Sequence, residues 1–468
     1  MQQDEQRGVT LEEMLQAREN RAAQQRAMQK CHPGALLVSF TLNIPGAVKR
    51  FPEAVRAFAE GCRRIERELS REGAVVSQRW RQQPVTGCEA IWAVRGCDPL
   101  LLKERMCAVE DGSRMGRLFD IDLIDSQGKG ISRSRLGLPP RRCLLCGEPA
   151  HQCARSQAHP AEQLQAAVRR IIREEFLEQR ADAVAAAACR ALLYEVSATP
   201  KPGLVDRANN GSHRDMDFFT FLDSTAALVP YFGRLFLAGA DAAAEQPQRL
   251  LSRVRYPGLL AQDAMFKATG GVNTHKGLVF SLGLLCAAAG YSEANGLPQD
   301  VHALLGLCGR IVSDAAQQEL SRAAADGGQT HGEQIYAAAG IAGVRGEAAA
   351  GFPSVERFGL PALRKFLAQG MSLNDAGSLT LLVLLGQVDD TNMIARGGLE
   401  VWREIRKMIA RRMDSPPFPD RPEIERLDRE FIHRNLSPGG CADLLAMTYM
   451  LYFLEQEKES ENGVFSPS

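Results

Sequence analysis

The sequence predicts a two-domain protein, with an N-terminal α+β domain (a small mixed sheet with helices) and a C-terminal all-α domain. Its 468 residues exceed what one ordinary hydrophobic core accommodates. Strand patterns are confined to the first part, whereas helical patterns follow one another from Ala161 onward. We therefore expect domains at residues 1–178 and 179–468, with the boundary within a helix or at a break in it.

Composition narrows the class of protein. Apolar residues make up 45% of the chain and charged residues 24%, as in soluble globular proteins. The net charge is zero, and a small basic excess in the first part is too weak to indicate nucleic-acid binding. The N-terminus is polar, which argues against a signal peptide. Twelve cysteines without a secretion signal favour reduced thiols and a cytoplasmic protein.

One apolar run, Gly277–Gly290, resembles a membrane span in composition. A helix that crosses a bilayer needs about 20 apolar residues, and this run is shorter. It is therefore interpreted as a buried core helix, and no membrane association is expected.

Strand and helix signals alternate in the first domain. Thr10 and Glu13 form a capping-box pattern that starts a helix running to about Lys30. Ala35–Leu42 has the composition of a buried strand, and Phe51–Ser70 carries its apolar residues on one helical face. Further strands are predicted over Cys88–Val94, Arg117–Ile124 and Ile131–Leu136, with the turn Ser126–Gly130 between the last two.

The second domain is predicted to be helical throughout. Ala161–Val196 is an almost unbroken helical pattern, and a cluster of prolines and glycine at residues 200–203 ends it. Beyond this cluster, helical segments alternate with Gly- and Pro-rich loops, and alanine clusters suit close packing of helices.

Two carboxylates alternate along a predicted strand. Asp120 and Asp122 should point to one face, with Ile121 on the other. Such a pair can hold one or two Mg²⁺ ions, an arrangement typical of enzymes that transfer a nucleotidyl group. Arg133 and Arg135 alternate in the same way and could face phosphates or pair with the aspartates. An ordinary hairpin with a solvated polar face is the alternative.

Cysteines follow directly after a pair of arginines. Cys143, Cys146, His151 and Cys153 form a zinc-like set, although a single residue between the last two strains tetrahedral ligation. Reduced structural thiols are the alternative. The preceding Arg141 and Arg142 are suited to binding phosphate.

A polar run, Lys267–Gly277, interrupts the helical second domain. Gly270 and Gly271 allow the backbone to approach a ligand closely, and Asn273, His275 and Lys276 add hydrogen-bonding and cationic groups. The order of residues is not that of a Walker loop. A polyphosphate is the ligand that such a run favours.

Further polar residues lie in other loops of this domain. They are Lys201, Asp206 and Asp215 after the long helix, Glu347, and the adjacent Asp389 and Asp390. The last pair could clamp a metal at a helix start, or could cap the helix. Each residue alone could be ordinary capping or surface polarity, but their joint occurrence in an apolar domain favours a site.

Three segments of the first domain resemble the holo-citrate lyase synthase family, the apo-citrate lyase phosphoribosyl-dephospho-CoA transferases. They are Ser39–Lys49, Gly116–Asp122 and Leu138–Gly147, and the resemblance covers roughly residues 10–178. It implies that a serine of the citrate lyase acyl carrier (gamma) subunit attacks the α-phosphate of triphosphoribosyl-dephospho-CoA and that pyrophosphate leaves. A malonate decarboxylase carrier remains open as the acceptor, because its prosthetic group is the same.

The polar segments of the second domain together resemble the triphosphoribosyl-dephospho-CoA synthase family, from about residue 185 to 455. The resemblance implies that the ribose 2′-hydroxyl of dephospho-CoA attacks the anomeric carbon of ATP. Adenine then leaves and the triphosphate is retained. The two domains would thus perform consecutive steps, with Mg²⁺ in both.

Roles in the second domain follow from this resemblance. Phosphate contacts are expected from Gly270, Gly271, Asn273, Lys276 and Lys201. Mg²⁺ binding or stabilisation of the developing cation is expected from Asp206, Asp215, Asp389 and Asp390, and proton transfer from His275 and Glu347.

Two competing interpretations remain. The second domain could be an Mg²⁺-dependent hydrolase like an ADP-ribose glycohydrolase, with water as acceptor. The first could be a zinc-containing docking module for a lyase complex, without catalysis.

Overall fold

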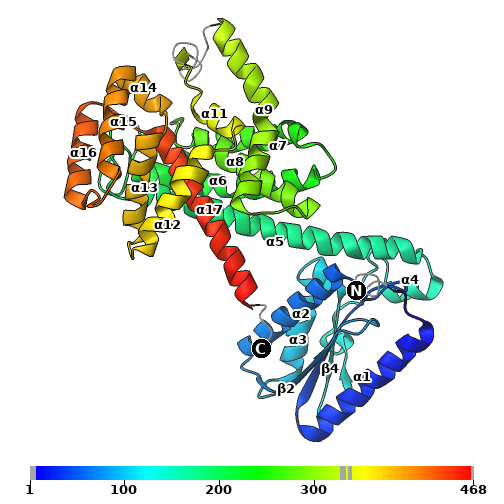
Figure 1. Cartoon of the computed structure of the whole chain (residues 1–468). Helices are drawn as coiled ribbons and strands as arrows, with labels where there is room; N and C mark the ends of the chain where they lie inside the picture. Colours follow the sequence, from blue (N-terminus) through cyan, green and yellow to red (C-terminus); the bar gives the residue numbers. More distant parts are fainter. Residues whose placement is uncertain (1–6, 327–333, 336–339, 465–468) are drawn as a thin grey trace. The chain divides into compact units, whose positions relative to one another are not determined.

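The computed structural model describes residues 7–326, 334–335 and 340–464. The chain divides into two compact units, Met1–Phe176 (unit 1) and Leu177–Ser468 (unit 2) (Figure 1). Both this division and the predicted boundary near residue 178 fall within one continuous helix, α5 (Ala161–Ser197).

Unit 1 contains a five-stranded sheet of order β2-β3-β1-β4-β5. Its strands are β1 (Leu36–Leu42), β2 (Val75–Gln82), β3 (Glu89–Arg95), β4 (Phe119–Ile124) and β5 (Gly130–Ile131). The predicted α+β class is confirmed, but the sheet is not mixed, because every pairing between the described strands is antiparallel. Short turns join β2 to β3 and β4 to β5, and such turns connect only antiparallel neighbours.

The helices of unit 1 include two that the sequence signals missed, over Pro99–Asp111 and Ala150–Ser156. The helices are α1 (Leu11–Cys31), α2 (Pro52–Arg71), α3 (Pro99–Asp111) and α4 (Ala150–Ser156), with 3₁₀ turns η1 (Met115–Leu118) and η2 (Arg133–Leu136). The capping box at the start of α1 is present as predicted. The predicted strand Ile131–Leu136 is wrong beyond its first residue, because η2 follows and ends at Gly137 in the left-handed region.

Two hydrophobic layers fix which way the strand side chains point. On one face of the sheet, Phe40 of β1 stacks on Phe58 of α2 and meets Phe119 of β4 edge-on, with ring centroids 5.0 and 5.3 Å away. On the other face, Leu37 of β1 packs in a cluster with Met28 of α1. Residues of β1 that alternate with Phe40 therefore face α1.

Unit 2 is all-α in its described residues, as predicted. Its further helices are α6 (Phe218–Asp241), α7 (Leu250–Ala268), α8 (Lys276–Asn295), α9 (Val301–Asp326), α11 (Gly343–Ala349), α12 (Leu360–Ala368), α13 (Leu373–Gln387), α14 (Thr391–Gly397), α15 (Leu399–Met413), α16 (Arg421–His433) and α17 (Gly439–Val464), with short turns η3 (Pro247–Arg249) and η4 (Val355–Gly359).

Helix α8 forms the centre of unit 2. A Cβ atom on Gly290 would lie 1.9 Å from the carbonyl oxygen of Phe236, so glycine is required for α6 and α8 to approach so closely. The helix has the length and the mean hydropathy, 1.4, of a membrane span, but 78% of that window is buried inside the unit. It is therefore the buried core helix that the sequence predicts.

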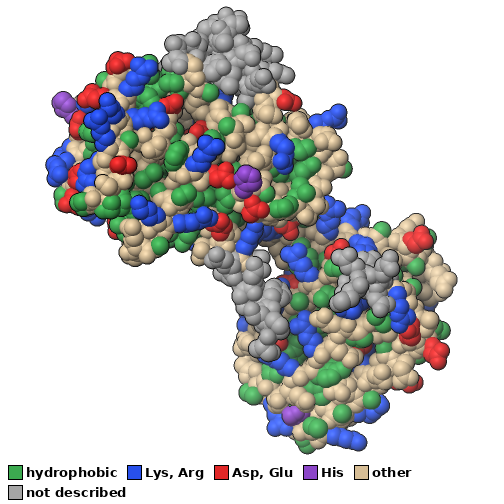
Figure 2. Space-filling view, in the orientation of Figure 1, with side chains coloured by type: hydrophobic (Ala, Val, Ile, Leu, Met, Phe, Trp, Pro, Cys, Tyr) green, Lys and Arg blue, Asp and Glu red, His purple; other side chains and the backbone are tan. Residues whose placement is uncertain are grey.

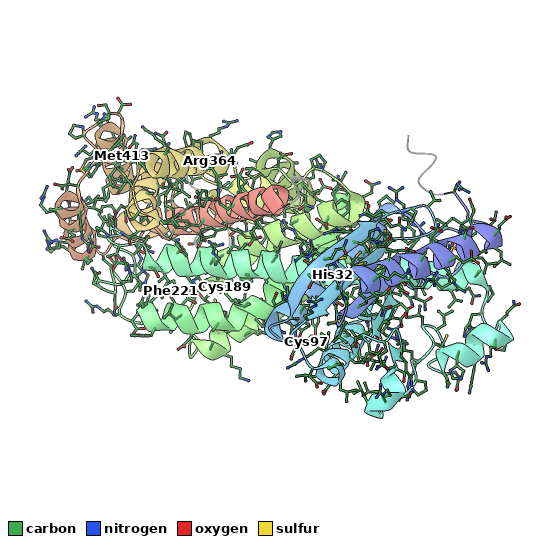
Figure 3. All side chains as sticks on the ribbon, turned by 90° about the horizontal axis from the view of Figure 1, so that it is seen from below. His32, Cys97, Cys189, Phe221, Arg364 and Met413 are labelled. Atoms are coloured by element: carbon green, nitrogen blue, oxygen red, sulfur yellow. The ribbon has the colours of Figure 1, made fainter. Side chains whose placement is uncertain are left out.

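The cysteines are distributed over both units, and all twelve are free thiols. Figure 3 labels Cys97, which lies in unit 1, and Cys189, which lies on the part of α5 that belongs to unit 2. On the face shown in Figure 2, basic and acidic side chains are interspersed over the helical unit, without a continuous patch of one sign.

Candidate active sites

The paired aspartates of β4 lie on the sheet face that carries α1. Phe119 and Ile121 are buried in the opposite layer, whereas Asp120 and Asp122 are exposed. In the register with β1, Asp122 lies opposite Ser39, which accepts a hydrogen bond from Gln25 of α1. The predicted orientation is thus confirmed. Although the Asp122 side chain is exposed, protein atoms around its carboxyl group displace part of the surrounding water, and this effect, followed by the charge of Asp120, raises its pKa.

Lys103 and Glu110 of α3 bind the backbone of β4, and Glu110 also binds Arg141. Lys103 donates to the carbonyl oxygen of Ile121 at 2.9 Å, and the amide of Ile121 donates to Glu110 at 2.8 Å. Arg141 pairs with Glu110 at 2.5 Å and also donates to the carbonyl of Phe119. Burial raises the pKa of Glu110, which the nearby cations oppose.

This network brings Arg141 to the aspartates, as the sequence suggested. Its Nη1 lies 3.7 Å from Oδ1 of Asp120. Lys103 and Glu110 were missed because α3 was not predicted. Asp98 before Pro99 is a standard helix start, with a capping side chain and proline in the first turn, and could have revealed it.

The other predicted arginines of unit 1 are placed differently. Arg142 is exposed, and its carbonyl accepts a hydrogen bond from Arg117 at 2.7 Å. Arg133 lies on η2 and contacts Asp111. Arg133 and Arg135 therefore do not alternate along a strand beside Asp120 and Asp122, and that interpretation is wrong.

A cluster of three cysteines and one histidine lies after these arginines, with a different histidine from the one expected. One ligand atom each from Cys143, Cys146, Cys153 and His159 lie within 4.8 Å of one another. His151 is exposed on α4 and does not belong to the group. The expected strain from ligands two residues apart is thus avoided.

Unit 2 contains a cavity of about 1410 Å³. Its wall includes seven of the residues predicted for this domain, namely Lys201, Asp215, Asn273, His275, Lys276, Glu347 and Asp389. Four others do not line it, namely Asp206, Gly270, Gly271 and Asp390. The structure therefore brings together most, though not all, of a set spread over about 190 residues of sequence.

The four excluded residues have local structural contacts. Gly270 and Gly271 adopt φ of 63° and 91° after the end of α7, and the amide of Gly271 donates to the carbonyl of Phe266 at 2.7 Å, which closes the helix C-terminus. Asp206 is buried, and its carboxylate accepts hydrogen bonds from backbone amides of its own loop, including that of Lys201.

Asp390 acts as the N-cap of α14, the alternative that the sequence left open. Its Oδ1 accepts from the amides of Asn392 and Met393 at 2.9 and 3.1 Å, and its Oδ2 accepts from the amide of Cys441 at 2.8 Å. The carboxylate is buried, which raises its pKa against the opposing effect of these bonds. Its neighbour Asp389 lines the cavity and pairs with Arg406 at 2.7 Å.

His275 lies at the N-terminus of α8 with its ring buried. Its Nδ1 is hydrogen-bonded to the hydroxyl of Ser224 at 2.7 Å, and Thr274 donates to the same hydroxyl. Phe221 packs edge-on against the ring. The buried Nε2 has no hydrogen-bond partner among the described residues. Burial, and then the charge of Lys201, lower the pKa of His275 to about 3, so the ring is neutral near pH 7.

A buried ion pair lies at the start of the loop that follows α5. The ammonium group of Lys201 contacts the carboxylate of Glu195, and both residues are almost fully buried. Burial raises the pKa of Glu195, and the charge of Lys201 opposes this effect. Glu195 is a cavity residue that sequence reasoning missed, because its position on a long helix gave no signal of its own.

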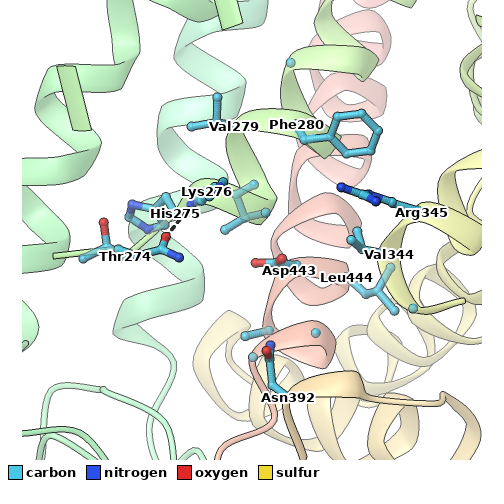
Figure 4. A pocket seen from close by; sticks show the side chains of 18 of the residues that line it. Thr274, His275, Lys276, Val279, Phe280, Val344, Arg345, Asn392, Asp443 and Leu444 are labelled. Carbon is cyan, nitrogen blue, oxygen red and sulfur yellow. Dashed lines mark hydrogen bonds between the residues drawn. The ribbon is translucent and has the colours of Figure 1, made fainter. Parts of the chain in front are cut away.

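Asp443 on α17 is the second cavity carboxylate that was missed. It faces the start of α8, where a Cβ atom on Gly277 would lie 2.0 Å from its Oδ2 (Figure 4). Burial raises its pKa well above the usual range, and the charges of Glu195 and Asp390 act in the same direction. Arg345 of α11 and Lys276 extend into the same space.

No group of three carboxylates forms in the described part of unit 2. The cysteine–histidine cluster of unit 1 is the one set of three or more convergent metal-ligating side chains among the described residues. Glu347 accepts hydrogen bonds from the amide and hydroxyl of Ser354, and Asp215 lies 4.0 Å from His213. A Mg²⁺ ion at Asp389 or Asp215 would therefore need phosphate oxygens as further ligands, as is common for this metal.

The antiparallel α+β unit with paired strand carboxylates and the all-helical unit with its cavity each match a family of transferases, so the chain is a bifunctional transferase. Residues 9–175 match the family of apo-citrate lyase phosphoribosyl-dephospho-CoA transferases, and residues 181–462 match the ATP:dephospho-CoA triphosphoribosyl transferases. The chain belongs to both families, as a fused protein of citrate lyase prosthetic-group biosynthesis.

Full-length relatives have the same fused organisation. The chain is 33% identical to Protein CitXG of Leuconostoc mesenteroides subsp. cremoris, over 95% of this chain and 97% of that protein. It is also 33% identical to Protein CitXG of Haemophilus influenzae, over 95% and 96%. The 2-(5''-triphosphoribosyl)-3'-dephosphocoenzyme-A synthase of Pectobacterium atrosepticum is 44% identical over 57% of this chain and 87% of its own length. These matches give no support to the hydrolase or to a purely docking role.

Proposed function

We propose that unit 2 joins ATP to dephospho-CoA in its cavity and that unit 1 transfers the resulting prosthetic group to a serine of the apo-citrate lyase acyl carrier. The observation that carries this proposal is the cavity itself, in which residues from α5, α8, α11 and α17 converge. Its volume suits a large two-part substrate.

In unit 2, the 2′-oxygen of dephospho-CoA bonds to the anomeric carbon of ATP while the bond to adenine breaks. Glu347 accepts the hydroxyl proton, and Asp443, whose pKa is raised by burial, donates a proton to the departing adenine. His275 is neutral and serves as a hydrogen-bonding group at Nε2. Lys276, Asn273 and Arg345 contact the triphosphate, aided by the N-terminus of α8.

In unit 1, the serine hydroxyl loses its proton as its oxygen bonds to the α-phosphorus, the bond to pyrophosphate breaks, and the leaving pyrophosphate takes up a proton. Asp120 and Asp122 fit a Mg²⁺ site, because both are exposed oxygen ligands on one face of a strand. The ion would neutralise phosphate charge. Arg141, held by Glu110 beside Asp120, and the exposed Arg142 contact the phosphates. The protein would act in the cytoplasm, a reducing compartment that suits its free thiols.

Adenine release tests the cavity assignment. Asp443→Asn should lower the rate of adenine formation from ATP, Mg²⁺ and dephospho-CoA by about 100-fold or more, since general-acid catalysis contributes on that scale. The exposed Asp414, changed to Asn, provides a matched control outside the cavity. Full activity of Asp443→Asn would contradict the assignment, as would adenine release that does not need dephospho-CoA.

A further inference from the structure

Four side chains that the transfer reaction does not use converge near the surface of unit 1. Cys143 and Cys146 precede α4, Cys153 lies on it, and His159 follows it. The Sγ atoms of Cys146 and Cys153 are 3.4 Å apart, and His159 Nε2 lies 3.2 Å from the Sγ of Cys146. Tetrahedral zinc with bonds of about 2.3 Å to sulfur and 2.0 Å to nitrogen places its ligand atoms about 3.5 to 3.8 Å apart. These two spacings are close to those of a coordination shell, and all four ligand atoms lie within 4.8 Å of one another.

The backbone around the first two cysteines is folded to present sulfur to a cation. Gly147 follows Cys146 with φ of 75°, and the amide of Cys143 donates to the carbonyl of Glu148 at 2.6 Å. The chain therefore turns back directly after a Cys-x-x-Cys pair, a spacing typical of structural zinc ligands.

The fourth ligand is supplied by the way α4 ends. Gln157 adopts a left-handed conformation with φ of 47°, and the amide of Ala158 donates to the carbonyl of Cys153 at 3.1 Å. This turn reverses the chain, so that His159 reaches back to the cysteines. His151, near the start of α4, has no such route and stays exposed.

Hydrophobic burial does not account for the order of this segment. Helix α4 has seven residues, none of them buried. An isolated helix of that length is unstable in water. A disulfide bond joins two cysteines, so it would leave the third unpaired, and all three cysteines are free thiols. Four bonds to one metal ion would cross-link this segment and supply the stabilisation that a hydrophobic core does not provide here.

We propose that Cys143, Cys146, Cys153 and His159 bind one zinc ion that has a structural role. All four tetrahedral positions are taken by protein, as in structural rather than catalytic zinc sites. The site lies directly after Arg141 and Arg142 in the chain. Arg117 holds this segment by donating to the carbonyl oxygens of Arg142 and Cys143 at 2.7 and 3.1 Å. The ion would hold the same segment at Cys143, and thereby the position of Arg141.

The metal itself provides the direct test. The native full-length protein, purified without chelator, should contain one zinc per chain by elemental mass spectrometry. Replacement by Co²⁺ should give a thiolate-to-cobalt charge-transfer band and the intense visible bands of a tetrahedral site. His159→Ala should lose the metal, His159→Cys should keep it with shifted visible bands, and His151→Ala, the matched control, should change nothing.

Two results would overturn the proposal. One is a native protein that contains no zinc and gives no thiolate band with Co²⁺. Another is loss of the metal in His151→Ala with retention in His159→Ala.

A consequence for Arg141 rests on the proposed function of unit 1 and has its own readout. Without zinc, modification of the acyl carrier should fall at least tenfold, whereas adenine release by unit 2 should be unchanged. Full carrier modification by a protein shown to be metal-free would refute this positioning role of the ion, and the metal measurements decide the site independently of it.

Discussion

Replacing Lys201 by Met tests whether the Lys201 cation stabilises unit 2 by compensating the buried carboxylate of Glu195. In the native protein the Lys201 ammonium contacts the carboxylate of Glu195, and both are almost fully buried. Methionine retains the length and the apolar stem of lysine but removes the cation. Glu195 is then left buried without its counter-ion.

The expected loss of stability is large. Breaking a buried ion pair by removing one partner costs about 3–5 kcal/mol, because the remaining charge is uncompensated. The double variant Lys201→Met with Glu195→Gln removes both charges and should recover most of that loss. A double-mutant cycle isolates the coupling between the two residues.

The sign of the pH dependence follows from the direction of the Glu195 pKa. Burial raises this pKa above its ordinary value of 4.5, and loss of Lys201 removes the main opposing effect. A carboxyl group with a raised pKa in the folded state binds more protons folded than unfolded, so stability falls as pH rises above about 4.5. The deficit of Lys201→Met should therefore be larger at pH 8 than at pH 5, and that of the double variant should not.

Hydrogen–deuterium exchange measures this unit by unit. Peptides from α8 and α13 should lose protection equivalent to about 3–5 kcal/mol, whereas peptides from β1 in unit 1 serve as the internal control. A loss below about 1 kcal/mol, or one of equal size in the double variant, would refute the view that Lys201 mainly compensates Glu195.

Three further substitutions test local assignments. His275→Gln should make the stability of unit 2 less sensitive to acid between pH 6.5 and 4. A histidine whose pKa is lowered in the folded state binds fewer protons folded than unfolded, so the folded state loses stability as pH falls below 6.5. Urea unfolding at pH 7 and pH 4.5 measures this loss, and an unchanged loss in the variant would contradict the assignment. Asp390→Asn should keep the helix cap at Oδ1 and adenine release, although it loses the hydrogen bond from the Cys441 amide. Asp390→Ala should cost about 1 kcal/mol or more of stability. Loss of activity in a stably folded Asn variant would restore the metal-ligand assignment. Gly270→Ala should lower stability by about 1 kcal/mol, because φ is 63° there, without changing the KM for ATP; a raised KM would indicate phosphate contact after all.

Local signals in the sequence predicted much of the fold. The capping box at Thr10, the apolar face of the helix over 51–70 and the alternation around Ile121 all depend on neighbouring residues, and the structure confirms them. Strand β2 was missed because it is exposed along most of its length, so its residues carry no apolar alternation.

The site predictions failed where a contact with a residue distant in sequence decides whether a side chain faces the site or makes a structural hydrogen bond. Asp389 and Asp390 are adjacent and identical in type, yet one faces the cavity and the other caps α14 and binds the amide of Cys441, 51 residues away. Asp443 lies on an apolar helix, and only the arrangement of α17 against α8 identifies it. Likewise, the turn at Gln157 makes His159, not His151, the partner of the cysteines.

Division of labour between the two units is the central claim, and one measurement tests it most directly. The variant with both Asp120→Asn and Asp122→Asn is incubated with ATP, Mg²⁺, dephospho-CoA and the apo acyl carrier, with Glu104→Gln, an exposed carboxylate on α3, as the control. Adenine is followed by chromatography and the carrier by intact mass. We predict that the double variant releases adenine at the normal rate but leaves the carrier unmodified, whereas the control performs both steps. A carrier modified by the double variant, or adenine release lost with it, would contradict the account.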